Sequence, residues 1–267
     1  MRTIQQTASG MEMLQLGDGP FIFSGKPPIC RGNLVISSTA NETVRVRAIS
    51  TEHREDKKLA PLGFGQIQVQ TRLAPGASGA VPAYFQIDRH TAPGIYKTSV
   101  ACGKEQKQIV VHVQENPRLC ISPARVQLRG AGGDHLSHTL VLHNPGNVTH
   151  TLDEVATVWL EERDWVGRTL VYTLRKSSDD EKHQAFLDRL LDEFRQSALP
   201  PVRVSLKYDS PEIRPGDTRV VELELTLPPQ RMNKGRTYLG FIKLMGNRLW
   251  LEVACNGSPT SMKRRPK

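Results

Sequence analysis

The segment Leu119–Thr151 constrains the fold more than any other part of the chain. It reads as a strand, a glycine-rich loop, a second strand, a tight turn and a third strand. We predict the turn at Asn144–Asn147, because Pro145 presets φ for the second turn position and Gly146 accepts the positive φ of the third. Strands joined in this way are typical of an antiparallel β-sandwich, so the segment predicts an all-β fold.

The first half of the chain also consists of short runs with strand periodicity. In 43–49, valine and alanine alternate with threonine and arginine, and in 66–70 three glutamines alternate with Ile67 and Val69. This period of two is expected of half-buried strands. Because turn residues separate the runs and no helical period appears, we predict an Ig-like sandwich. The predicted strands are Phe21–Phe23, Leu34–Ser37, Thr43–Ile49, Gly65–Leu73, Ala80–Ile87, Ile95–Ala101 and Gln108–Val113.

The second half repeats the pattern with longer runs, and 267 residues suffice for two domains. We predict a flexible N-terminal lead over 1–18, an Ig-like sandwich over 19–115, a second Ig-fold sandwich over 116–257 and a basic disordered tail over 258–267. The further predicted strands are Val155–Leu160, Thr169–Arg175, Val202–Tyr208, Thr218–Leu227, Arg236–Met245 and Arg248–Cys255.

An amphipathic helix interrupts the second sandwich over 178–198. Phe186, Leu190 and Phe194 recur at helical spacing on one face. Ser178 with Glu181 three residues later has the spacing of a capping box, so we predict that the helix begins there. The insertion either covers an open sheet edge or one end of the sandwich, or docks a partner through its apolar face. In the second case the partner-binding residues are Phe186, Leu190 and Phe194.

The chain is basic, with a formal net charge of +9. Part of the charge lies in the tail, which is either a solvated segment or an arm for phosphate groups and acidic surfaces. Aromatic residues do not interleave with these cations, so nucleic-acid binding is not predicted. The tail cations are Lys263, Arg264, Arg265 and Lys267.

No apolar run approaches the roughly 20 residues of a membrane span. The N-terminus lacks the apolar core of a signal peptide. These observations predict a cytoplasmic protein, with a periplasmic location as the alternative.

The cysteines form no CxxC pair, which argues against zinc-ribbon and thioredoxin-like sites. Bridges are geometrically possible between Cys30 and Cys102 and between Cys120 and Cys255, one in each half. In the absence of an export signal, we expect four buried thiols instead.

A cluster of histidines between His135 and His150 is the strongest candidate for a metal site. Across a regular Asn144–Asn147 hairpin, His143 and His150 would be diagonal neighbours, roughly 7–8 Å apart. Their spacing matches no zinc pattern, so a solvated sheet face is the preferred interpretation. The sequence also contains no G-x-S-x-G, P-loop, H-E-x-x-H or dinucleotide-binding motif. We therefore predict a protein that is not an enzyme and has no cofactor.

The second half resembles the PapD-like branch of Ig-fold domains, which includes fimbrial chaperones and the major sperm protein domain. The first half is similar to Ig-like modules of bacterial surface and carbohydrate-active proteins, through Leu73–Gly76 and Ala92–Tyr96. If the chaperone resemblance extends to function, Arg125 matches the arginine that anchors a bound subunit's C-terminus. The segments that carry the PapD-like resemblance are Ile121–Val126 with Leu128, Leu140–Asn147, Ile213–Asp217 and Arg236–Tyr238.

Together these features predict a non-catalytic interaction or structural module, an accessory component of a larger bacterial protein assembly. Its expected partners are other protein subunits, bound in part by strand-edge pairing. The alternatives are a periplasmic fimbrial-chaperone-like factor and a metal-dependent activity at the histidine cluster.

Overall fold

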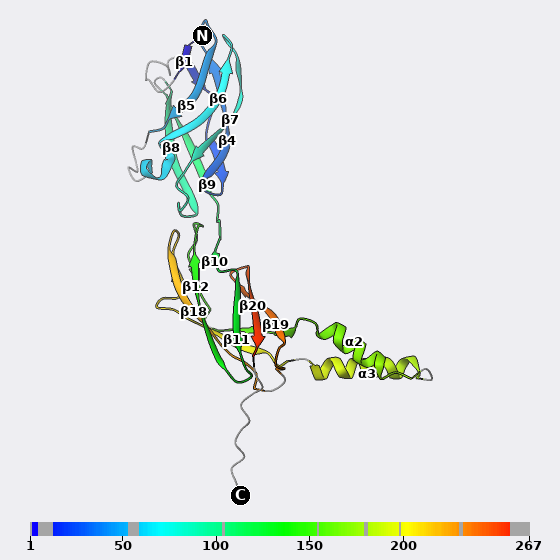
Figure 1. The fold of residues 1–267 in the computed structure, drawn as a ribbon. Helices are drawn as coiled ribbons and strands as arrows, with labels where there is room; N and C mark the ends of the chain where they lie inside the picture. Colours follow the sequence, from blue (N-terminus) through cyan, green and yellow to red (C-terminus); the bar gives the residue numbers. More distant parts are fainter. Residues whose placement is uncertain are drawn as a thin grey trace. The chain divides into compact units, whose positions relative to one another are not determined.

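The computed structural model describes residues 2–4, 13–52, 59–102, 105–153, 155–178, 181–197, 199–229 and 232–256 (Figure 1). The chain forms two compact units. Unit 1 contains Met1–Arg118, Asn144–Thr149 and Arg214–Gly216, and unit 2 contains Leu119–His143, His150–Ile213 and Asp217–Lys267. The basic tail, with Lys263, Arg264, Arg265 and Lys267, lies outside the described residues.

Unit 1 is a curled sheet of short strands around one apolar core. The strand order is β1-β5-β6-β7-β4-β3-β9-β8, and β2 pairs with β4. Phe23 and Phe85 meet edge to face at the centre, with ring centroids 4.9 Å apart. The strands are β1 (Arg2–Ile4), β2 (Leu14–Leu16), β3 (Phe21–Gly25), β4 (Ile29–Ser38), β5 (Val44–Ser50), β6 (Gln66–Leu73), β7 (Ser78–Gln86), β8 (Gly94–Cys102) and β9 (Glu105–Val113).

Every strand predicted in the first half coincides with one of these strands, from β3 to β9. The predicted flexible lead over 1–18 differs, because it contains β1 and β2. Leu14 and Leu16 are buried on either side of exposed Gln15, but three residues are too few for a sequence signal.

The Asn144–Asn147 segment is not the predicted hairpin turn. The Gly146 amide donates to Asn144 Oδ1 at 3.0 Å, and Asn144 Nδ2 donates to the Val148 carbonyl at 2.8 Å. Side-chain bonds of this kind offer the backbone an alternative to a hairpin ladder. Gly146 is not among the residues with positive φ. Glycine is needed there for close approach, because a Cβ would lie 2.2 Å from the Asn116 carbonyl oxygen.

Unit 2 is a sandwich of two sheets, ordered β10-β12-β18-β16-β14 and β11-β20-β19-β15. Between β10 and β11 the chain crosses from one sheet to the other, so β10 pairs antiparallel with β12 while β11 runs parallel to β20. The strands are β10 (Cys120–Ser122), β11 (Arg125–Gly130), β12 (His135–His143), β13 (His150–Thr151), β14 (Val155–Val158), β15 (Glu161–Glu162), β16 (Val202–Lys207), β17 (Glu212–Ile213), β18 (Thr218–Thr226), β19 (Thr237–Leu244) and β20 (Asn247–Cys255).

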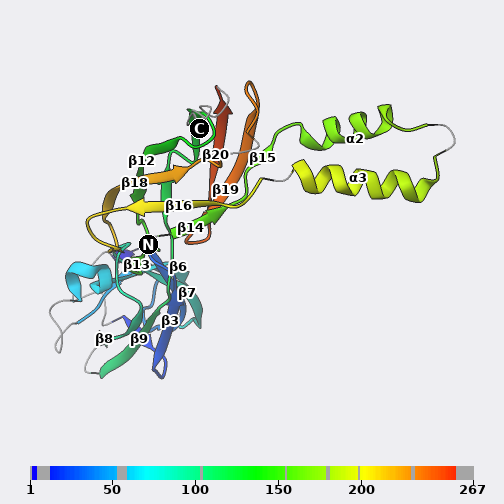
Figure 2. The same cartoon turned by 90° about the horizontal axis from the view of Figure 1, so that it is seen from below.

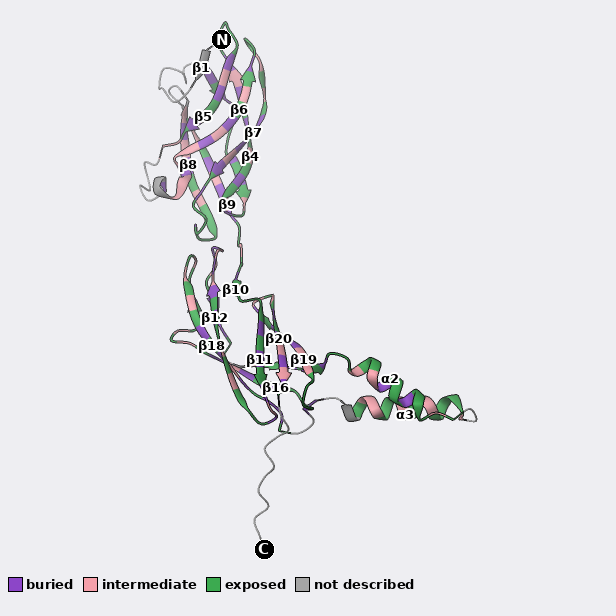
Figure 3. Ribbon diagram, in the orientation of Figure 1, coloured by how far each residue is buried: buried purple, intermediate pink, exposed green. Residues whose placement is uncertain are grey.

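Alternating burial along these strands places one face of each sheet in the core (Figure 3). In β18, for example, Val221, Leu223 and Leu225 are buried between outward-facing neighbours. The chain is therefore all-β and Ig-like, with a helical insertion in its second sandwich, as predicted.

The insertion holds two helices, α2 (Trp165–Arg175) and α3 (His183–Ser197), between β15 and β16 (Figure 2). The predicted strand Thr169–Arg175 is wrong, because these residues lie in α2. Their threonine and valine content favours a strand, but Thr169 and Thr173 recur at helical spacing and are buried. Packing against α3 decides the conformation.

The predicted capping box at Ser178–Glu181 is also wrong, because α3 begins at His183. The Glu181 amide donates to the Ser178 carbonyl at 3.0 Å, and the Glu181 carboxylate accepts from Arg189 instead of closing the box. The apolar face predicted over 178–198 is otherwise in α3, as expected.

The described thiols take part in no disulfide bond. Cys30 is reduced and buried, and burial raises its pKa to about 11. Cys255 is buried and Cys120 is exposed, which corrects the expectation that every thiol is buried. The side chain of Cys102 lies outside the described residues.

Candidate interaction surfaces

The α2–α3 hairpin extends away from the sheets of unit 2 and packs chiefly on itself (Figure 2). It therefore does not lie over a sheet edge or one end of the sandwich, which was the first of the two predicted roles. Trp165 at the start of α2 meets Phe194 near the end of α3, with centroids 5.1 Å apart. Arg189 of α3 donates to Ser177 Oγ at 2.9 Å and to the Thr173 carbonyl at 3.3 Å. These contacts join two antiparallel helices.

A buried carboxylate anchors the hairpin to the sandwich. Glu162 of β15 has a side-chain exposure of 8% and accepts from both terminal nitrogens of the Arg168 guanidinium. The hydrogen bond to Glu162 raises the pKa of Arg168. Arg236 approaches the same carboxylate from the loop before β19, at 3.6 Å. The ion pair of Arg168 with Glu162 thus holds the first turn of α2 against β15.

One side of the hairpin is apolar and exposed. On α2, Val166, Leu170 and Leu174 follow one another at four-residue spacing, with exposed fractions of 52%, 40% and 53%. On α3, exposed Leu191 continues a row with half-buried Leu187 and Phe194. We call these six residues the hairpin face.

The two rows lie on the same side of the hairpin. When each helix is viewed from its own N-terminus, its apolar row lies about a quarter turn clockwise from the surface that contacts the other helix. Because the helices are antiparallel, they are viewed in opposite senses, and both rows fall on one side. The hairpin face is therefore a single surface.

The predicted partner-binding residues divide between two places. Phe186, Leu190 and Phe194 are together on α3 and half-buried, and Phe194 contacts Trp165 of α2. Arg125 is exposed on β11, opposite Trp250 in the register with β20. The exposed half of the hairpin face comes mainly from α2, which sequence reasoning missed because it read that segment as a strand.

His143 and His150 are not cross-strand neighbours, because the Asn144–Asn147 segment does not form the regular hairpin on which that arrangement depended. His143 ends β12 opposite Thr218 of β18, and its Nδ1 lies 3.1 Å from Thr218 Oγ1. His150 is buried in β13, opposite Ile213 of β17. No group of three or more metal-ligating side chains occurs among the described residues. Nor is any described helix long and apolar enough to cross a membrane.

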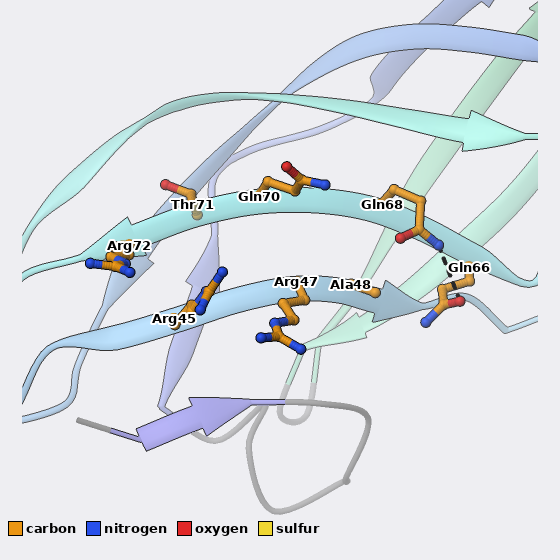
Figure 4. Close-up of a pocket in the computed structure, with 8 residues that line it drawn as sticks. All are labelled: Arg45, Arg47, Ala48, Gln66, Gln68, Gln70, Thr71 and Arg72. Atoms are coloured by element: carbon orange, nitrogen blue, oxygen red, sulfur yellow. Dashed lines mark hydrogen bonds between the residues drawn. The ribbon is translucent and has the colours of Figure 1, made fainter.

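A second surface lies on the outer face of unit 1 (Figure 4). Strands β5 and β6 line a hollow of about 1070 Å³. On β6, Gln68 Nε2 donates to Gln66 Oε1 at 3.2 Å. The hollow is lined by Arg45, Arg47, Ala48, Gln66, Gln68, Gln70, Thr71 and Arg72.

A neighbouring hollow of about 600 Å³ extends this surface across β7 and β4. Gln70 lines both hollows, and Tyr84 and Arg31 lie opposite each other on β7 and β4. We call this surface, with its arginines 31, 45, 47 and 72, the arginine face. Its sequence signal is the absence of any acidic residue from β4, β5, β6 and β7.

No protein-family model and no curated protein matches the chain. Several solved structures are similar to it at low identity. A protein of unknown function from Porphyromonas gingivalis W83 is 12% identical, over 91% of this chain and 99% of that chain, with a TM-score of 0.26. Titin domains Z1Z2 in complex with telethonin are 11% identical, over 92% and 98%, with a TM-score of 0.30. The Pseudomonas aeruginosa CupB2 chaperone is 8% identical, over 89% and 98%, with a TM-score of 0.24.

Proposed function

We propose that this chain is a non-catalytic structural component of a protein assembly and that it binds protein through the hairpin face. The exposed apolar row on α2 carries the proposal. Folded proteins rarely leave neighbouring large apolar side chains in water unless the surface binds something. In the described part of unit 2, α2 packs chiefly on α3, so the sheets do not account for this row.

The occupant that fits best is a second copy of the chain. Helix α2 carries Arg168 and Arg175 and no acidic residue. Helix α3 carries three acidic residues and two arginines, so it has a small net negative charge; they are Asp188, Asp192, Glu193, Arg189 and Arg195. A twofold axis along the hairpin places α2 of one copy over α3 of the other. The net-positive helix then faces the net-negative one, and the four helices enclose both hairpin faces.

Such an interface is small. A 15-residue helix is about 22 Å long, so two adjacent helices cover on the order of 400 Å² per copy. Interfaces of this size support weak, reversible association. We expect a dimer that dissociates in the micromolar range.

Sedimentation over a wide range of protein concentrations tests this proposal. The double variant Leu170→Glu with Leu174→Glu should weaken association at least 30-fold and leave the melting temperature unchanged, because both side chains are exposed. The matched control is Val220→Glu, an exposed apolar residue on β18 with 66% exposure. A wild-type chain that stays monomeric at the highest concentration, or equal effects of control and variant, would overturn the proposal.

Strand-edge binding is the second candidate, favoured by the position of β11. This strand ends its sheet and pairs only with β20 among the described strands, so its other edge can accept a partner strand. Arg125 begins β11 and is exposed. A fimbrial-chaperone-like role predicts that Arg125→Ala abolishes binding of a peptide with a free C-terminal carboxylate, and equal binding of the amidated peptide would exclude that role.

A further inference from the structure

The arginine face concentrates positive charge without neutralising it. Arg45 and Arg47 project from β5, Arg72 from β6 and Arg31 from β4, and the four strands that form the face contain no aspartate or glutamate. None of these arginines forms an ion pair with a carboxylate of the described residues.

The strand register makes this arrangement unfavourable for the isolated chain. Arg45 and Arg72 occupy directly opposed positions of β5 and β6. Like charges at such positions destabilise a sheet. A bound anion between the two guanidinium groups would convert this repulsion into attraction.

The polar side chains between the arginines suit hydroxyl groups. Gln66, Gln68 and Gln70 project from alternate positions of β6, so they follow one another about every 6.6 Å along the surface. Each amide offers both donors and an acceptor, as a sugar hydroxyl requires. An extended ligand that lies along β6 meets amides in sequence and guanidinium groups at its side.

We propose that the arginine face binds a linear polysaccharide that carries carboxylate or sulfate groups. Arginine recognises planar or multidentate oxyanions through paired hydrogen bonds. Single-stranded nucleic acid fits less well, because base stacking needs aromatic platforms and Tyr84 is the one aromatic residue lining the two hollows. The lining residues include no carboxylate, histidine or thiol, so the surface binds the polymer without cleaving it.

Titration calorimetry with the full chain tests the proposal at about 0.15 M salt, where surface charges further apart than about 8 Å are screened. The probes are a heparin oligosaccharide for sulfate, an oligogalacturonate for carboxylate, neutral dextran and oligothymidylate. We expect binding to at least one anionic sugar and none to dextran, and the stronger of the two identifies the oxyanion. Tighter binding to oligothymidylate than to both sugars, or binding to no probe, would overturn the proposal.

Variants separate a built site from general charge attraction. The triple variant Arg45→Gln, Arg47→Gln, Arg72→Gln should lose at least 30-fold in affinity for the sugar. The control triple variant Arg129→Gln, Arg203→Gln, Arg248→Gln removes the same charge from exposed strand positions of unit 2 and should change affinity less than threefold. Equal losses in the two triples would show nonspecific attraction and reject the site.

A neutral variant tests the amide contribution. Gln68→Ala with Gln70→Ala keeps the charge of the face, so it should weaken sugar binding severalfold while leaving the dependence of affinity on salt concentration unchanged. An unchanged affinity would remove the polysaccharide interpretation. Arg72→Gln alone is a milder charge variant, and its melting temperature confirms that any loss of affinity comes from a folded protein.

Discussion

The arginine face of unit 1 and the five-stranded sheet of unit 2 differ in whether their positively charged side chains lie next to a carboxylate. In unit 2, Lys207 of β16 lies 2.5 Å from Glu224 of β18, and His135 approaches the same carboxylate at 3.8 Å. In unit 1, Arg45 lies opposite Arg72. Both surfaces are strands with one buried face, so the fold does not impose the difference. A cation with a carboxylate across the strand contributes to structure, whereas cations left together are available for a ligand.

The largest expected effect concerns the ion pair between buried Glu162 and Arg168 in unit 2. Arg168→Gln leaves Arg236 as the remaining cation beside the Glu162 carboxylate among the described residues, so we expect the free energy of unfolding to fall by about 2 kcal/mol. Urea denaturation measures the change. Arg175→Gln on the same helix is exposed and should change it by less than about 0.5 kcal/mol. Equal effects would mean that Glu162 does not anchor the hairpin.

The pair of Lys207 with Glu224 should give a smaller, pH-dependent effect. The hydrogen bond to Lys207 lowers the pKa of Glu224, and the same bond raises the pKa of Lys207. The pair therefore stabilises fully between the unfolded pKa values, about 4.3 for glutamate and about 10.4 for lysine. Its contribution is lost as pH falls through the folded pKa of Glu224 or rises through that of Lys207.

Thermal unfolding of wild type and Lys207→Gln from pH 2 to 7 checks this dependence. The wild type should be more stable at pH 7, and the difference should vanish at the acid end. A difference that is constant with pH would show that Lys207 stabilises by packing alone.

The smallest expected change in stability is a gain rather than a loss. Arg45→Gln removes the cross-strand repulsion with Arg72, so we expect unit 1 to gain a few tenths of a kcal/mol, about 0.3. The gain should shrink in 1 M salt, where the screening length is about 3 Å. Melting temperatures at low and high salt measure it, and a loss of stability in Arg45→Gln would mean that Arg45 is a structural residue.

The strand pattern of both units was predictable because burial follows a period of two. The alternation of Val44 and Val46 with Arg45 reappears as buried and outward positions of β5. The helix α2 was not predictable in the same way. Its threonines and valines have strand propensity. Their helical spacing matters only because α3, which comes later in the chain, packs on α2, where Thr169 and Thr173 are buried.

The candidate surfaces were less accessible from sequence for a related reason. Arg45 and Arg72 each read as ordinary solvated strand positions, and only the pairing of β5 with β6 brings them together. The turn pattern predicted a glycine at position 146 for its positive φ. The sequence does not show that the Asn116 carbonyl lies beside Gly146, which is what excludes a side chain there. Long-range register, rather than local propensity, creates both features.

The point at which the hairpin joins unit 2 has a mechanical consequence. Strand β15, before the hairpin, belongs to the sheet with β19, and β16, after it, belongs to the sheet with β18. A pull on the hairpin therefore loads both layers of the sandwich at once. Because β15 ends its sheet whereas β16 lies between β14 and β18, such a pull is shared between an edge strand of one layer and an inner strand of the other.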